Sequence, residues 1–157
     1  MKTYTLKWEQ DIPVSLDKAW DFFSSPINLA KITPGGMGFR ITSDFTESTQ
    51  MYEGMLISYK ISPLFGIQMN WTTEITHIGP DKQYFIDEQR FGPYAMWHHE
   101  HHFKEIPGGV RMSDQLVYAI PYGAAGRLAN TLLVHNKVKG IFEFREKAVE
   151  GLFGKYK

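Results

Sequence analysis

A short stretch rich in histidine, residues 97–103, holds the side chains of this sequence best suited to chemistry. Four histidines fall within the five positions 98–102, interrupted by one glutamate. Histidine is the side chain whose charge changes near neutral pH, and its neutral ring is also the commonest metal ligand. The stretch could therefore move protons, orient a ligand or hold a metal, depending on which rings face the same way.

Strand periodicity divides these histidines between two faces. Turn signals at Gly92-Pro93 and Pro107-Gly108 bound a predicted strand over 94–106. Successive side chains of a strand point to opposite sides of the sheet. We expect the more apolar set to face the interior, namely Trp97, His99, His101 and Phe103. The other set suits solvent, namely Met96, His98, Glu100, His102 and Lys104.

The turn after this strand predicts how it pairs with the next one. If Pro107-Gly108 forms the centre of a tight two-residue hairpin, counting back from the turn places His101 opposite Asp114. Asp114 is the one carboxylate among the apolar set of the predicted strand 109–120. An unpaired buried carboxylate is costly, so we expect a His101–Asp114 pair inside the protein.

The preceding predicted strand, 83–91, adds polar groups to the same face. Asp87 and Gln89 share the parity of Phe85 and Phe91, which indicates that they too face inward. The pattern thus predicts an aromatic-walled cavity with a polar band, as suits a pocket for a small ligand. The residues expected to contact such a ligand are Trp71, Asp87, Gln89, Trp97, His99, His101, Phe103, Asp114, Tyr118 and His135.

Four interpretations of the polar band remain open. It could be a hydrogen-bonded network that only fixes strand register, or a patch that orients a ligand. It could also be catalytic, with His101 and Asp114 as general acid and base and His99 assisting. Finally, His99 and His101 could bind a metal with Asp114 or Asp87 as a third ligand. No nucleophile motif accompanies the band, which favours binding over catalysis. The three metal ligands depend on an inferred strand register, and we expect binding without a metal or cofactor.

The elements that must position the band follow from apolar periodicity and turn residues. Two short helices, 16–23 with Ser15 as N-cap and 27–32, follow a first strand at 3–14. Six more strands come next, at 39–43, 51–62, 66–78, 83–91, 94–106 and 109–120. Short turns between successive strands indicate antiparallel pairing. The order predicts one α+β domain over 1–157, with a curved sheet of six to seven strands.

One long helix is predicted over 124–153. Its inward stripe repeats at three- and four-residue steps and comprises Leu128, Thr131, Leu132, His135, Val138, Phe142, Arg145, Val149 and Leu152. The sheet's inner face and this stripe bury each other, which completes the domain. If Arg145 reaches the cavity, the ligand should be acidic.

The element order and three motifs resemble the START-like, helix-grip superfamily, which includes pollen-allergen relatives, polyketide cyclases and lipid-transfer domains. The motifs are Phe85-x-Asp87-x-Gln89-x-x-Gly92-Pro93-Tyr94, Trp97-x-His99-x-His101-x-Phe103 and Gly108-Gly109-x-x-Met112-x-Asp114. The chain looks most like bacterial ligand-binding members. The resemblance implies a cavity between sheet and long helix that binds a small hydrophobic molecule, possessing lipid-like or polyketide-like chemistry. Alternatives are a cyclase or dehydratase using His101 and Asp114, and a co-chaperone-like interaction module.

Composition supports this class and argues against others. Of 157 residues, 43% are hydrophobic and 15% aromatic, which suits an apolar pocket. The 17 basic and 17 acidic residues balance, so we expect no nucleic-acid partner. There are no cysteines, which removes disulfides and thiol chemistry. No apolar stretch approaches the ~18 residues that span a membrane, and we expect a cytoplasmic protein.

Overall fold

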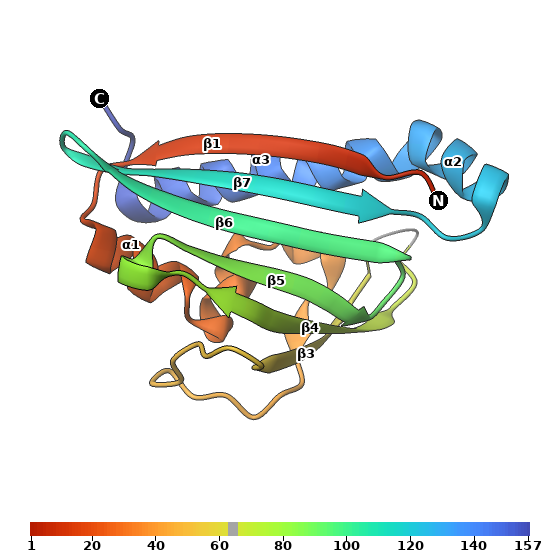
Figure 1. Ribbon diagram of the computed structural model, residues 1–157, viewed down its shortest axis with the longest axis horizontal. Helices are drawn as coiled ribbons and strands as arrows, with labels where there is room; N and C mark the ends of the chain where they lie inside the picture. The colour runs from red at the N-terminus through yellow and green to blue at the C-terminus, as the bar shows by residue number, and fades with distance from the viewer. Residues whose placement is uncertain (63–65) are drawn as a thin grey trace.

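The computed structural model describes residues 1–62 and 66–157, and its centre is a curved antiparallel sheet (Figure 1). Its seven strands lie in the order β1-β7-β6-β5-β4-β3-β2, so the first strand of the chain pairs with the last. The strands are β1 (Tyr4–Ile12), β2 (Arg40–Ile41), β3 (Leu56–Ile61), β4 (Met69–Ile78), β5 (Tyr84–Phe91), β6 (Met96–Ile106) and β7 (Gly109–Ala119). The predicted α+β class and strand order are confirmed.

Two short helices follow β1 and cover one end of the sheet. They are α1 (Leu16–Phe23) and the 3₁₀ helix η1 (Pro26–Ile32). The Ser15 hydroxyl accepts a hydrogen bond from the backbone of Lys18 at 3.3 Å, as an N-cap should. Trp20 is buried and points from α1 into the core. These helices bring apolar side chains from the start of the chain over the inner face of the later strands.

The predicted pairing of β6 with β7 is confirmed along its whole length. Ile106 opposes Gly109 across the Pro107-Gly108 turn, and His101 opposes Asp114. Gly108 takes a φ of +81°, a left-handed conformation that glycine adopts without strain. The tight turn therefore sets the register that places the inward histidines against the carboxylate.

The strands at the other edge of the sheet are shorter than predicted. β3 begins at Leu56, not at 51, and β2 spans only two residues of the predicted 39–43. Residues 51–55 form a loop, which is nevertheless fixed to β4 because the backbone of Ile75 donates to the carbonyl of Met55. Hydrophobic composition predicted an extended segment here, but only Met55 of these residues is fully buried, and none of them joins the strand.

The C-terminal helix is one continuous helical segment, but its type changes along its length from α to π and back to α. It consists of α2 (Gly123–Ala129), a π-helical segment η4 (Asn130–Val134) and α3 (His135–Phe153), and α3 runs behind β1 and β7 in Figure 1. The π-helical winding rotates the inward face. As a result Leu128 and Leu132 are 61% and 62% exposed, and the predicted stripe is wrong before Val134.

A buried hydrogen bond accompanies this change of winding. Asn130 turns inward, where its Oδ1 accepts from the Tyr118 hydroxyl at 2.9 Å. From Val138 onward the predicted stripe is correct through Val138, Phe142 and Val149, whereas Leu152 is half-exposed. The polar bond between η4 and β7 thus replaces the leucine contacts that the periodicity predicted.

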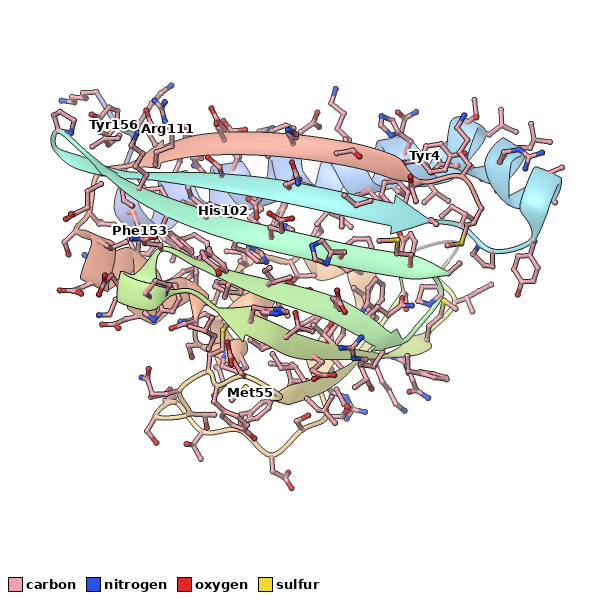
Figure 2. The ribbon with its side chains drawn as sticks, in the orientation of Figure 1. Tyr4, Met55, His102, Arg111, Phe153 and Tyr156 are labelled. Carbon is pink, nitrogen blue, oxygen red and sulfur yellow. The ribbon has the colours of Figure 1, made fainter. Side chains whose placement is uncertain are left out.

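The chain ends beside the β6–β7 turn. The Tyr156 hydroxyl donates a hydrogen bond to the carbonyl of Pro107, and Figure 2 shows Tyr156 and Arg111 at this same end of the sheet. Arg111 forms a bidentate ion pair with Asp11 across β7 and β1, at 2.7 and 2.9 Å. None of the described helices is both long and apolar enough to cross a bilayer.

Candidate functional site

Four ionisable side chains meet on the inner face of the sheet, and we call Asp87, His99, His101 and Asp114 the His–Asp cluster. They come from three neighbouring strands, β5, β6 and β7. Asp87 lies opposite His99 in one strand pair, and His101 lies opposite Asp114 in the other. Both histidines and Asp114 are buried, and Asp87 is partly buried. The alternation of strand side chains thus gathers distant residues at one place.

The cluster is joined by diagonal hydrogen bonds. His99 Nε2 donates to Asp114 Oδ1 at 2.9 Å, and His101 Nε2 donates to Asp87 Oδ2 at 2.8 Å. His101 Nδ1 also lies 2.9 Å from Asp114 Oδ1, but without the angle of a hydrogen bond. The expected His101–Asp114 contact is present, yet the well-formed bond to Asp114 comes from His99.

The two histidines carry different charges. Burial lowers the pKa of His101, but its contacts with Asp114 and Asp87 outweigh burial and raise the pKa above the ordinary value. Burial and the neighbouring His101 charge lower the pKa of His99 despite its bond to Asp114. His101 is therefore the imidazolium. Because a carboxylate only accepts, neutral His99 has its proton on Nε2 and a lone pair on Nδ1.

Both carboxylates are ionised. Burial raises the pKa of Asp114, but the bonds from His101 and His99 more than offset it and hold the pKa well below its usual range. Burial likewise raises the pKa of Asp87, and its bond with His101 and the charges of both histidines bring the pKa below the ordinary value. The negative charges of the two carboxylates are thus balanced by the positive charges of His101 and Arg145.

Arg145 reaches the cluster from α3, as its place on the helical stripe allowed. Its Nη1 lies 4.0 Å from Asp114 Oδ1, and its guanidinium lies 5.4 Å from the centre of the Phe142 ring. The side chain is only 13% exposed, and Nε has no hydrogen-bond partner among the described residues. A buried charged donor without an acceptor is energetically unfavourable. An acceptor group that reached Arg145 Nε would remove this cost.

A cavity of about 120 Å³ adjoins the cluster, between the sheet, the short helices and α3. Its polar wall consists of Asp87, His99, His101 and Arg145, with Thr73 and Ser25 nearby. Its apolar wall comprises Phe22, Phe23, Pro26, Leu29, Ile32, Met51, Ile57, Tyr59, Ile75, Phe85 and Trp97. Asp114 lies behind the histidines. The cavity is smaller than most ligand pockets, which have volumes of about 300–1,000 Å³.

Among the residues predicted to contact a ligand, several serve the core instead. Trp71 packs against Trp97 with ring centres 5.2 Å apart, and Trp97 alone of the two lines the cavity. Phe103 packs against Trp20, at 5.7 Å between ring centres. Gln89 donates to the carbonyl of Tyr94, which closes the β5–β6 connection. Gln89 lies beyond the last residue pair of β5 and β6, Glu88 opposite His98, and it does not line the cavity.

Two further predicted residues, Tyr118 and His135, form a polar contact beside η4. The Tyr118 hydroxyl lies 3.4 Å from His135 Nδ1 and donates to Asn130. Both lie outside the lining of the cavity described above. The lining residues that sequence reasoning missed include Ile57, Tyr59, Thr73 and Ile75 of β3 and β4, and a second group from the helices α1 and η1. Their apolar spacing predicted a buried face, but nothing in it indicated which strands they would cover.

The outer face of β6 has its own polar network, as predicted. His98 Nδ1 lies 2.8 Å from Glu88, and Glu100 bridges His98 and His102. Figure 2 labels His102 on the face toward the viewer. Burial opposes protonation of His98, but its bonds to Glu88 and Glu100 raise its pKa. This partly solvated network is separated from the cavity by the sheet.

The geometry of His99 also allows acid–base chemistry. Asp114 holds one ring nitrogen, while the ring lines the cavity and carries its lone pair on Nδ1. A base whose orientation is set by a buried carboxylate is the arrangement of a general base. His99, not His101, is the better-placed base, because both ring nitrogens of His101 lie within 2.9 Å of a carboxylate oxygen, whereas His99 Nδ1 is 3.6 Å from the nearest one.

We expect the free energy of unfolding of the metal-free protein to have a maximum near pH 6.5, the ordinary pKa of histidine being about 6.5. Above it, His101 keeps a proton that the unfolded chain releases, so stability falls as pH rises. Below it, His99 stays neutral while the unfolded chain takes up a proton, so stability falls as pH drops. Asp87, Asp114 and Arg145 are the charges facing the pair.

Urea unfolding in EDTA, repeated between about pH 5 and 8, measures how the free energy of unfolding depends on pH. His99→Gln should flatten the acid side of the maximum, since Gln takes up no proton in either state. The outer-face control His98→Gln/His102→Gln should still lose stability as the pH falls below the maximum. A wild-type profile that changes in one direction only between about pH 5 and 8 would contradict the assigned charges.

Comparison with known proteins identifies the fold. No family model matches the sequence, and no curated protein matches it. A solved protein of Chromobacterium violaceum aligns with a TM-score of 0.71 at 12% identity, over 97% of this chain and 99% of its own. Major latex-like protein 151 of Panax ginseng aligns at 0.65 and 14%, over 96% and 97%.

A point mutant of norcoclaurine synthase from Thalictrum flavum, in complex with a transition-state analogue, aligns at 0.65 and 12% identity over 96% of each chain. At such identities the likeness shows the fold alone. The chain has a helix-grip fold, as its element order indicated. What the cavity holds must be argued from its own residues.

Proposed function

We propose that this protein binds a small, largely apolar molecule with one hydrogen-bond-accepting end, in the cavity between the sheet and α3. The observation that carries the proposal is Arg145 in the wall of a largely apolar cavity, with a buried Nε that lacks an acceptor among the described residues. Ligand pockets typically combine apolar walls with a few polar groups that fix orientation. Here Arg145 and the His–Asp cluster form that polar end.

The size of the cavity limits the ligand. Its volume of about 120 Å³ is close to the roughly 150 Å³ of an engineered apolar cavity that binds benzene. A compound with one ring or a short chain therefore suits it better than a lipid. Its apolar body would lie against Ile57, Ile75 and Phe22, and its acceptor atom would face Arg145.

The proposal can be tested with probes of matched size. Ligand-observed NMR and calorimetry with benzoate, benzamide and toluene compare one ring with and without an acceptor end. We expect benzoate and benzamide to bind more tightly than toluene. Arg145→Met should weaken benzoate about 10- to 100-fold, the value of a charged hydrogen bond, and leave toluene unchanged.

A cavity-filling variant supplies the control. Ile75→Phe places a larger side chain in the cavity wall and should abolish binding of all three probes. Leu56→Phe introduces the same side chain at a half-exposed position of β3 and should change nothing. Equal binding by the two variants, with both folded by circular dichroism, would place the probes elsewhere and refute the proposal.

Catalysis by His99 is a second candidate function, favoured by the Asp114–His99 pair and by the place of the His99 ring in the cavity wall. A base in this position could remove a proton from carbon next to a carbonyl group. NMR of acetophenone in D₂O follows exchange of its methyl protons. Exchange faster than in buffer and lost in His99→Gln would support this function, and exchange at the buffer rate would refute it.

A further inference from the structure

We propose that Asp87, His99 and His101 form a site for one divalent first-row transition-metal ion, with Asp114 as an outer carboxylate that orients both rings. From the sequence we expected no metal, although His99 and His101 with Asp114 or Asp87 were a possible ligand set. The folded geometry brings Asp87, His99 and His101 together and so favours that set. The inference is separate from ligand binding and can be tested without a ligand.

The three donor atoms already have the spacing of metal ligands. One atom from each of Asp87, His99 and His101 lies within 4.8 Å of the others. Asp87 Oδ2 is 2.8 Å from His101 Nε2 and 3.6 Å from His99 Nδ1. Donors on a tetrahedral ion with bonds of about 2.0–2.1 Å stand about 3.3 Å apart. Small shifts would therefore suffice to admit an ion.

The polarity of these atoms also favours a cation between them. His99 donates from Nε2 to Asp114, so its Nδ1 presents a lone pair toward the Asp87 carboxylate. Two acceptors thus face each other at 3.6 Å, while the proton on His101 Nε2 bonds to the same Asp87 oxygen. A metal ion would satisfy all three acceptors after displacing that one proton.

Asp114 occupies the place of an outer-sphere partner. Its Oδ1 lies 2.9 Å from His99 Nε2 and 2.9 Å from His101 Nδ1, the two nitrogens that point away from the proposed ion. Metal-bound histidines usually donate their second N–H to a carboxylate, which fixes the tautomer and the ring orientation. The buried carboxylate of Asp114 is already hydrogen-bonded to His99, and a small rotation of the His101 ring would let it accept from the second histidine as well.

The proposed ion would have an open side. Asp87, His99 and His101 all line the cavity, and Asp114 lies behind them. Two histidines and one carboxylate with open positions form a set that binds iron(II), zinc and cobalt. The net charge would be +1, from the divalent ion, the carboxylates of Asp87 and Asp114, and Arg145. The loaded site would thus favour an anionic group on the open position.

The test uses the full chain without a histidine tag, treated with EDTA and then titrated with Co²⁺ or Zn²⁺. We expect one ion per chain by calorimetry, and visible Co²⁺ absorption bands. Asp87→Asn and His99→Gln should each weaken binding at least about tenfold, since each removes a ligand. The outer-face control His98→Gln/His102→Gln should leave the inner site unchanged.

A measurement on the unaltered protein guards against variants that misfold. X-ray absorption of the zinc-loaded chain should show two imidazole ligands. The proposal is overturned if the unaltered chain binds no ion. It is equally overturned if the outer-face variant abolishes binding while His99→Gln retains it.

Discussion

Asp114→Asn is expected to lower the free energy of unfolding by about 3–5 kcal/mol, the usual cost of removing one partner of a buried ion pair. Asp114 is 7% exposed, and it contacts His99, His101 and Arg145. Asparagine keeps the shape but removes the charge, which leaves the buried cations of His101 and Arg145 opposed by Asp87 alone. Urea unfolding at neutral pH measures the effect.

The same substitution at an exposed ion pair provides the control. Asp11→Asn, beside Arg111 on the outer face, should have little effect because solvent screens that pair. A double-mutant cycle of Asp114→Asn with His101→Gln should give a coupling free energy above about 1 kcal/mol. If Asp114→Asn lowers the free energy of unfolding no more than Asp11→Asn does, the buried charges of the His–Asp cluster do not stabilise one another as described.

Trp20→Ala should cost about 3–5 kcal/mol, as expected for removal of a large buried aromatic side chain. Trp20 packs edge-on against Phe85 and Phe103, with ring centres 5.9 and 5.7 Å away. It attaches α1 to the sheet, and α1 supplies Phe22 and Phe23 to the cavity wall. We therefore expect weaker binding of the one-ring probes as well, at temperatures where the variant remains folded.

Thermal and urea unfolding measure this loss, and Tyr122→Ala is the matched control. Tyr122 is an aromatic residue that is 84% exposed before α2, so its removal should leave stability nearly unchanged. Equal costs for the two variants would show that α1 does not anchor the core. If Trp20→Ala greatly lowers stability but leaves probe affinity unchanged, Trp20 stabilises the fold without shaping the cavity.

The parts of this fold that sequence predicted well depend on short-range rules. The Pro107-Gly108 turn determines the β6–β7 register, and parity then places His101 opposite Asp114. The division of the histidines between two faces follows from the same alternation. These inferences involve residues close to one turn, where few other arrangements compete.

The remaining errors involve contacts between distant segments. The bond from His101 to Asp87 depends on the β5–β6 register, which no tight turn specified. The π-helical segment depends on the buried bond between Tyr118 and Asn130, which turned Leu128 and Leu132 outward. Tertiary contacts override helical periodicity in such cases. The cavity wall from α1 and η1 was beyond prediction for the same reason.

Native mass spectrometry of the freshly purified full chain tests the central claim, that the cavity binds a small molecule, most directly. The account predicts one bound species of low mass, or a shift on adding benzoate, in the wild type and in Leu56→Phe. The cavity-filling variant Ile75→Phe should show neither. A wild-type chain that stays bare with all three one-ring probes, or an adduct that Ile75→Phe retains, would contradict the account.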